Sequence, residues 1–185
     1  TQVRLILDSL KMKGLKVRAT EAMFSYFALK PFISSLRTAT GSPALGPVKR
    51  NKNAIFKLWF IVAFIDIWLG YLFKVRPILS KNNFVIADRF YTDMWANLAY
   101  YGYLPDWAFG IFLKLLPKAD KSFMLSVDPK IVQKRETEFP SDYYEEQSRI
   151  YKKLSKYIDF YTVNANKNPK TVFREINKIL DSSLS

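Results

Sequence analysis

The chain has 185 residues, 49% of them hydrophobic, which is enough to bury one core, so a single domain over 1–185 is expected. It contains no cysteine and no histidine, which excludes disulfide scaffolds, thiolate sites and histidine chemistry and leaves catalysis to Asp, Glu, Lys, Arg and backbone amides. The formal charge of +13 favours an anionic partner or reflects a lysine-rich surface kept for solubility, and the scattered basic residues predict no nucleic-acid-binding stripe.

The first third of the chain predicts one helix, one strand and a long irregular region. Apolar residues recur at helical spacing over 1–13, and Gly14 supplies a stop. A short strand is predicted over 15–19. Beyond it, we expect a mixed apolar segment over 24–36 and a loop over 40–53, where Gly and Pro cluster.

Residues 54–73 form the most apolar stretch of the chain, with only Lys57 and Asp66 charged among twenty residues. That length could cross a bilayer core of ~30 Å. However, an ionised Asp66 near the middle would cost roughly 2.5–3.5 kcal/mol in a membrane. A buried helix running towards Leu79 is therefore favoured over stable membrane insertion. Because the chain opens on an amphipathic stretch rather than a secretory signal, we expect a cytoplasmic protein.

Strands alternate with helices in the rest of the chain. Compact apolar runs of the kind that form buried parallel strands occur at 83–87, 121–127 and 160–164. Helices are predicted at 92–101, 107–116, 142–158 and from Pro169 to Leu180, with another opened by Pro129. This alternation predicts a doubly wound α/β protein with a parallel sheet, in which ligands bind at the carboxyl ends of the strands.

Two of these predicted strands are followed by an aspartate, Asp88 and Asp128. Asp88 precedes Arg89, so that a carboxylate able to hold a hydrated Mg²⁺ adjoins a guanidinium able to clamp a phosphate. Phosphoryl transfer needs little more from a protein than positioned positive charge and a metal. The alternative is a surface ion pair at the end of a strand.

A polar loop between two helices is the second candidate for phosphate chemistry. Lys134 and Arg135 end one helix and Arg149 projects from the next, so that basic residues could close over transferring phosphates. The alternative is a solvated helical hairpin in which Asp142 caps the second helix and Glu145 completes a capping box.

Two further sets of residues have a functional and a structural interpretation. Asn164 and Asn166 could contact the edge of a base or form the turn before Pro169, and the turn is favoured. A group of aromatic residues could line a base pocket, although their helical spacing favours a place in the core: Tyr91, Trp95, Tyr100, Tyr101 and Tyr103.

In this order and spacing, the segments resemble the thymidylate kinase family of P-loop nucleotide kinases over nearly the whole chain. Asp88-Arg89-Phe90 matches the family's strand-end Asp-Arg-aromatic motif. The opening Thr1-Gln2 helix, followed by Gly14-Leu15-Lys16-Val17, looks like the segment directly after the Gly-Lys-Ser of the P-loop. The region around Arg135 resembles the family's lid, at about 134–143.

The resemblance implies a three-layer α/β/α P-loop NTPase fold with a parallel sheet, whose first strand and P-loop are missing from this chain. It implies transfer of the γ-phosphate of ATP to dTMP or a similar nucleoside monophosphate, with ATP and Mg²⁺ as cofactors. It also suggests a homodimer formed through helices beside the sheet. As an isolated polypeptide, a chain truncated after its P-loop is expected to be unstable and inactive.

The resemblance also assigns roles to single residues. Arg89 and Arg37 would bind the acceptor phosphate, Asp88 would lie near the metal, and Arg135 would reach the transferring phosphoryl group. The remaining assignments are substrate-binding for Phe64, Asp93 and Asn97, lid for Lys134, Asp142 and Arg149, and cofactor-binding for Thr1 and Asn164.

The base-binding positions depart from the family pattern. Asp66 and Ile67 stand where the family usually has an acidic or Asn residue followed by a thymine-contacting Arg. Ala63 stands where the family has a stacking Phe, and Phe64 is adjacent. Asp93 and Asn97 also differ from the usual Ser and Tyr. The sequence therefore leaves the identity of the acceptor open.

Two alternative functions remain. One is a related P-loop kinase for another nucleoside or small alcohol, and the other is a non-catalytic, membrane-associated protein built around the apolar helix.

Overall fold

The computed structural model describes residues 2–20, 27–29, 31, 58–82, 84–128, 131 and 141–182. These residues form a mixed α/β structure with parallel strands. They divide into two compact units: a terminal unit, Thr1–Val17 with Lys118–Ser185, and a central unit, Arg18–Pro117. The predicted segment at 24–36, apart from four of its residues, and the predicted loop at 40–53 lie outside the described residues.

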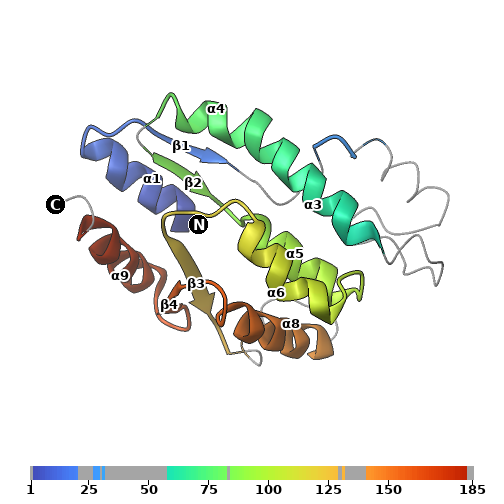
Figure 1. Ribbon diagram of the computed structural model, residues 1–185. Coiled ribbons are helices and arrows are strands. Elements are labelled where there is room, and N and C mark those ends of the chain that lie inside the picture. Colours follow the sequence, from blue (N-terminus) through green and yellow to red (C-terminus); the bar gives the residue numbers. More distant parts are fainter. Residues whose placement is uncertain are drawn as a thin grey trace. The chain divides into compact units, whose positions relative to one another are not determined.

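Two strands pair side by side in the central unit, β1 (Val17–Thr20, whose first residue belongs to the terminal unit) and β2 (Phe84–Ala87) (Figure 1). The backbone N–H of Asp88 donates to the carbonyl of Thr20 at 3.0 Å. Because both residues stand where their strands end, this bond joins two carboxyl ends, and the strands run parallel.

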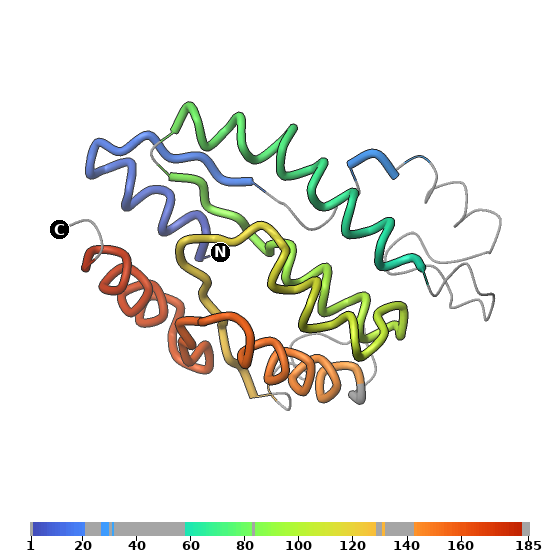
Figure 2. The backbone as a smooth tube through the Cα atoms, in the orientation of Figure 1, coloured from blue at the N-terminus to red at the C-terminus, as the bar shows by residue number. Residues whose placement is uncertain are grey.

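One long helical rod lies between β1 and β2 in the sequence, and it confirms the helix predicted up to Leu79 (Figure 2). It consists of α3 (Trp59–Gly70), a π-helical turn η2 (Tyr71–Val75) and α4 (Arg76–Leu79). Phe60, Ala63 and Ile67 are buried along one side of α3, where they form part of the core. Within the described ranges, no helix has both the length and the apolar character needed to cross a membrane.

The helices α5 (Tyr91–Tyr100) and α6 (Asp106–Leu115) complete the core of the central unit. Trp95 is fully buried, and its ring N–H donates to the carbonyl of Phe109 at 3.1 Å. Tyr91 and Tyr103 are buried as well. For these three aromatic residues the core interpretation is confirmed.

The terminal unit contains the second pair of strands, β3 (Ser122–Ser126) and β4 (Phe160–Asn164). They are parallel, in a register that runs from Ser122 opposite Phe160 to Ser126 opposite Asn164. The helices of this unit are α1 (Gln2–Met12), α8 (Ser141–Leu154) and α9 (Pro169–Asp181).

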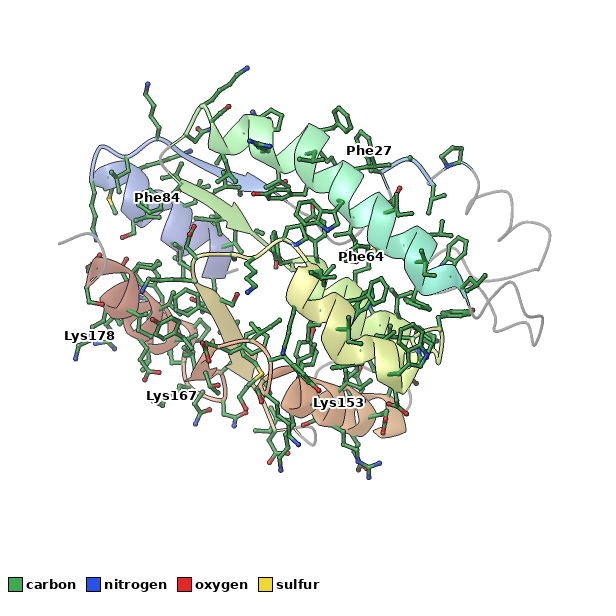
Figure 3. All side chains as sticks on the ribbon, in the orientation of Figure 1. Phe27, Phe64, Phe84, Lys153, Lys167 and Lys178 are labelled. Carbon is green, nitrogen blue, oxygen red and sulfur yellow. The ribbon has the colours of Figure 1, made fainter. Side chains whose placement is uncertain are left out.

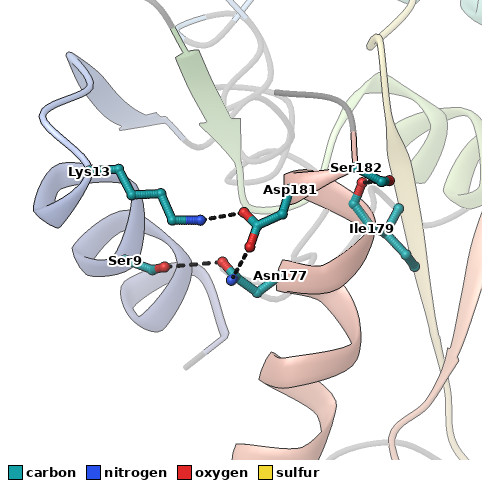
Figure 4. Close-up of polar contacts among 6 residues, drawn as sticks. All are labelled: Ser9, Lys13, Asn177, Ile179, Asp181 and Ser182. Carbon is teal, nitrogen blue, oxygen red and sulfur yellow. Dashed lines mark hydrogen bonds and ion pairs between the residues drawn. The ribbon is translucent and has the colours of Figure 1, made fainter. Parts of the chain in front are cut away.

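Helices α1 and α9 pack together although they come from opposite ends of the chain (Figure 4). The Ser9 hydroxyl donates to Asn177 at 3.0 Å, Asn177 donates to Asp181 at 3.0 Å, and Lys13 forms an ion pair with Asp181. Pro169 occupies the first turn of α9, as predicted. Asn168 caps the helix, because its side chain accepts the N–H of Lys170 at 2.9 Å.

Two details of the predictions are wrong. The apolar strands were expected to be buried on both faces, but every residue of β2 is partly exposed and Leu125 of β3 is 43% exposed. Each described sheet has two strands, so each strand has one edge without a neighbouring strand, which leaves its side chains more exposed than those of a central strand. Asp142 was expected to cap its helix, but Ser141 already has helical conformation, so Asp142 stands inside the first turn.

Candidate functional site

Asp88 and Arg89 stand at the joined carboxyl ends of β1 and β2, where the sequence predicted them. Both are exposed to solvent. The hydrogen bond from the Asp88 amide to Thr20 holds the start of the turn against the neighbouring strand. A carboxylate and a guanidinium are thus presented side by side at the edge where parallel sheets bind ligands.

Arg89 adopts a left-handed backbone conformation, with φ of +62°. Left-handed geometry costs a residue with a side chain about 1–2 kcal/mol, and such strain is concentrated at functional sites. The turn leads at once into α5, whose first turn is capped by Asp93: its carboxylate accepts the N–H of Phe90 at 2.8 Å. The chain therefore passes from strand to helix within three residues, and the left-handed backbone of Arg89 makes the change of direction between them.

Asp66 is a buried carboxylate whose role in the structure the sequence did not reveal. It is 4% exposed and accepts three backbone N–H groups in a row, from Phe27 and Ala28 at 2.7 Å each and from Leu29 at 3.1 Å. Such bonds satisfy a buried carboxyl group whose burial without partners would be costly. A lone acid in an apolar helix was the signal that could have predicted a buried anchor of this kind.

Tyr91, the first residue of α5, connects the turn to this anchored segment. Burial, and after it the nearby Tyr71 and Asp66, raises the pKa of Tyr91 far above its ordinary value, so it is a neutral phenol at physiological pH. Gly70 leaves space there, since a Cβ at its position would lie 3.5 Å from Phe27 Cβ and 3.7 Å from the Tyr91 hydroxyl. The start of α5, helix α3 and residues 27–29 thus meet at one place in the central unit.

Three of the four predicted substrate-binding residues lie on the helices behind the turn. Phe64 packs its ring edge-on against Trp95 and Phe112, with centroids 6.3 and 5.1 Å apart, and so points from α3 toward α5 and α6 (Figure 3). Asp93 and Asn97 are half-buried and one helical turn apart on α5. The structure therefore brings Asp93 and Asn97 onto one face of the helix that Arg89 leads into.

The predicted residues of the terminal unit have local partners. Asn164 accepts the N–H of Asn166 at 3.0 Å, and Asn166 accepts the N–H of Asp128 at 3.1 Å, which confirms the predicted turn. Arg149 is exposed and pairs with Glu146 on its own helix at 3.3 Å. Four other predicted site residues lie outside the described residues: Thr1, Arg37, Lys134 and Arg135. Of Asp142 only the helical backbone is described.

The fit of Asp88 to Mg²⁺ can be judged from its donors. In the part of the chain that the structure describes, no group of three or more acidic side chains could hold a metal ion by itself. Mg²⁺ commonly takes one or two carboxylates and completes its octahedral shell with water and phosphate oxygens. One exposed carboxylate at a strand end suits that mode of binding, in which a phosphate ligand must be present.

Comparison with known proteins yields similar solved structures but no family. The chain is similar to a deoxyadenosine kinase from M. mycoides with the products dCMP and a flexible dCDP bound, at 18% identity over 91% of this chain and 100% of that one, with a TM-score of 0.44. A structure of deoxyadenosine kinase from M. mycoides with bound dATP gives 18% identity, 90% and 100% coverage, and a TM-score of 0.43. No family model and no curated protein matches the chain. These values assign it neither a family nor an activity.

Proposed function

We propose that this protein is a kinase that transfers the γ-phosphate of ATP to a nucleoside monophosphate such as dTMP, forming the diphosphate. The observation that carries the proposal is Arg89, held in a left-handed conformation beside Asp88 at the joined ends of two parallel strands. Backbone strain is concentrated at functional sites, and this turn stands at the edge where parallel sheets bind ligands.

The chemistry at this turn follows from fixed charge. The Arg89 guanidinium is a cation that can donate two parallel hydrogen bonds to an acceptor phosphate. Asp88 would hold Mg²⁺ together with phosphate oxygens, and the bound ion would supply charge neutralisation between the donor and acceptor phosphates. The residues of this chain would then orient the acceptor, which is the main contribution of proteins to phosphoryl transfer.

A second acceptor class, a nucleoside or another small alcohol, is favoured by the positions that depart from the thymidylate kinase pattern. Ala63 and Ile67 are buried in the core, 0% and 2% exposed. The carboxylate of Asp66 is occupied by three backbone amides. These positions cannot contact a thymine base as their counterparts in that family would, so the base must be recognised elsewhere.

The role of Arg89 is tested by Arg89→Ala beside Arg174→Ala, which removes an exposed arginine from α9. Binding of ATP and of each acceptor is measured by calorimetry, and phosphoryl transfer is measured with ATP and Mg²⁺. Arg89→Ala should lower kcat/KM or acceptor affinity by about 2–4 kcal/mol, as the loss of one charge-stabilising donor does elsewhere. Arg174→Ala should change neither. Equal behaviour of the two variants would remove Arg89 from the site.

The acceptor is identified by a panel of dTMP, dUMP, UMP, CMP and AMP, with thymidine, deoxyadenosine and deoxycytidine alongside. Turnover or binding of monophosphates alone supports the first proposal. A response to nucleosides in place of monophosphates supports the second. If none of these compounds binds, the kinase proposal is wrong.

A further inference from the structure

The rod α3–η2–α4 and the helix α6 expose an unusual number of large apolar side chains. We name them the α3–α6 apolar face: Leu58, Val62, Ile65, Leu72 and Phe73 on the rod with Trp107, Ile111 and Leu115 on α6. Their exposed fractions run from 38% at Val62 to 65% at Phe73. Single exposed apolar residues are common, but a contiguous set on neighbouring helices marks an interaction surface.

The exposed residues of α3 follow one seam of the helix. Leu58, which directly precedes α3, is followed by Val62 and Ile65 at spacings of four and three residues. Residues at this spacing project from one side of an α-helix. The opposite side of α3 carries the buried core residues, so the seam is a second apolar side, which the core does not require.

The exposed sides of the rod and of α6 adjoin each other. Phe60 of α3 meets Trp107 and Phe112 of α6, with ring centroids 5.9 and 5.2 Å apart. Nearer the carboxyl end of both helices, the ring N–H of Trp68 donates to the carbonyl of Leu115 at 3.1 Å. These contacts hold the two helices side by side and parallel, so the exposed apolar residues of the face come from two helices that touch each other.

Among the described residues, the charged side chains nearest to this face in sequence are mostly basic. Arg76 and Lys81 follow the seam, Lys114 lies on α6, and all three are exposed. The acidic residue within 58–82, Asp66, is 4% exposed and turned toward residues 27–29. Asp106 at the start of α6 is the exposed acid nearest in sequence to the face. The whole chain carries a net charge of +13.

We propose that the α3–α6 apolar face docks on the surface of an anionic lipid bilayer. The apolar side chains would enter the boundary between headgroups and acyl chains, and the basic residues would contact the acidic headgroups. A second copy of the chain is a less suitable occupant because it would set one basic border against another in a pair that already carries twice the positive charge. The proposal does not depend on the kinase proposal.

The proposal is tested by co-sedimentation of the full chain with vesicles of phosphatidylcholine, with and without phosphatidylserine. The chain should bind the mixed vesicles, bind those without phosphatidylserine weakly, and leave the mixed vesicles partly when salt is raised. Trp107, at 64% exposed, should contribute a blue shift of the fluorescence on binding that Trp107→Phe removes.

Variants separate the apolar contribution from the electrostatic one. Ile65→Glu and Ile111→Glu, at exposed positions on the two helices, should each lower partition into mixed vesicles at least tenfold. Met12→Glu is the matched control, since Met12 is 84% exposed on α1. Lys81→Glu should lower binding by about fivefold or more, the effect of losing one basic residue near a charged surface. Circular dichroism checks that each variant is folded. If one of the two glutamate variants does not fold, the apolar contribution is judged from the glutamate variant on the other helix.

Three results would overturn the proposal. The first is vesicle binding that is unchanged in both glutamate variants, because charge alone would then explain it. The second is a dimer in sedimentation velocity that Ile65→Glu dissociates, with no vesicle binding, because a second copy would then cover the face. The third is a monomer that binds no vesicle.

Discussion

Arg89 illustrates at the scale of one residue how a backbone conformation and a side chain can be in conflict. Its φ of +62° is one that glycine adopts without penalty, yet the position holds an arginine. The hydrogen bond from the preceding amide to Thr20 and the Asp93 cap on α5 fix the turn from both sides. The surrounding structure therefore imposes the strained backbone. An arginine at this position contributes a guanidinium that glycine, which would adopt the same backbone without strain, would lack.

This strain is measurable by comparing Arg89→Gly with Arg89→Ala. Both variants lose the guanidinium, but only glycine relaxes the left-handed backbone, so Arg89→Gly should have the higher free energy of unfolding by about 1 kcal/mol. Urea unfolding measures the difference. Both should lose acceptor binding equally if the guanidinium is the functional group. A glycine variant no more stable than the alanine variant would contradict the strain.

At the scale of elements, Asp66 ties residues 27–29 to the middle of α3. The segment lies between β1 and the rod in the sequence, and its amides converge on one carboxylate. The Phe27 ring also stacks on Phe73 with centroids 5.9 Å apart. The carboxylate of Asp66 in an apolar helix thus determines where residues 27–29, which come after the first strand, pack against α3.

Asp66→Ala should release this segment. Three amides would lose their acceptor in a partly buried place, so the free energy of unfolding should fall by about 2–4 kcal/mol. Asp66→Asn keeps one acceptor oxygen and should cost less. Hydrogen exchange at Phe27, Ala28 and Leu29 should accelerate in the alanine variant ahead of exchange in β2. Unchanged exchange at those three amides would show that the anchor does not hold the segment.

At the scale of the whole molecule, the excess of basic residues is the dominant feature. A net charge of +13 repels itself in the folded state, and screening by salt relieves that repulsion. The same charge attracts phosphates and acidic lipids, so salt should oppose both of the proposed binding activities while it stabilises the fold.

The melting temperature should therefore rise by a few degrees, roughly 3 °C, between low salt and about 0.5 M NaCl. Lys118→Glu combined with Lys156→Glu lowers the net charge from +13 to +9 at two exposed positions outside helices and strands. This double variant should melt higher than the parent at low salt and respond less to added NaCl. Differential scanning calorimetry tests both. A melting temperature of the parent that falls as salt is added would show that repulsion among the basic residues does not limit the stability of the fold.

Much of the secondary structure could be predicted because it depends on local pattern. The runs at 83–87 and 160–164 became β2 and β4, and Pro169 opened α9, since hydrophobic periodicity and proline geometry act over a few residues. Helix ends were less accurate. Helix α8 ends at Leu154 rather than Ile158, because the N–H groups of Lys156 and Tyr157 donate to carbonyls three residues back, as in a turn.

By itself, the sequence determined the elements, their alternation and the position of Asp88 and Arg89 after a strand, because these follow from residue order and local propensity. Only the tertiary structure decided that Arg89 is left-handed, that Asp66 is buried against three amides, and that two helices share an exposed apolar face. Each of these depends on groups far apart in the sequence: Thr20 with Asp88, Phe27 with Asp66, and Trp68 with Leu115. Such contacts are set by packing, which no local pattern encodes.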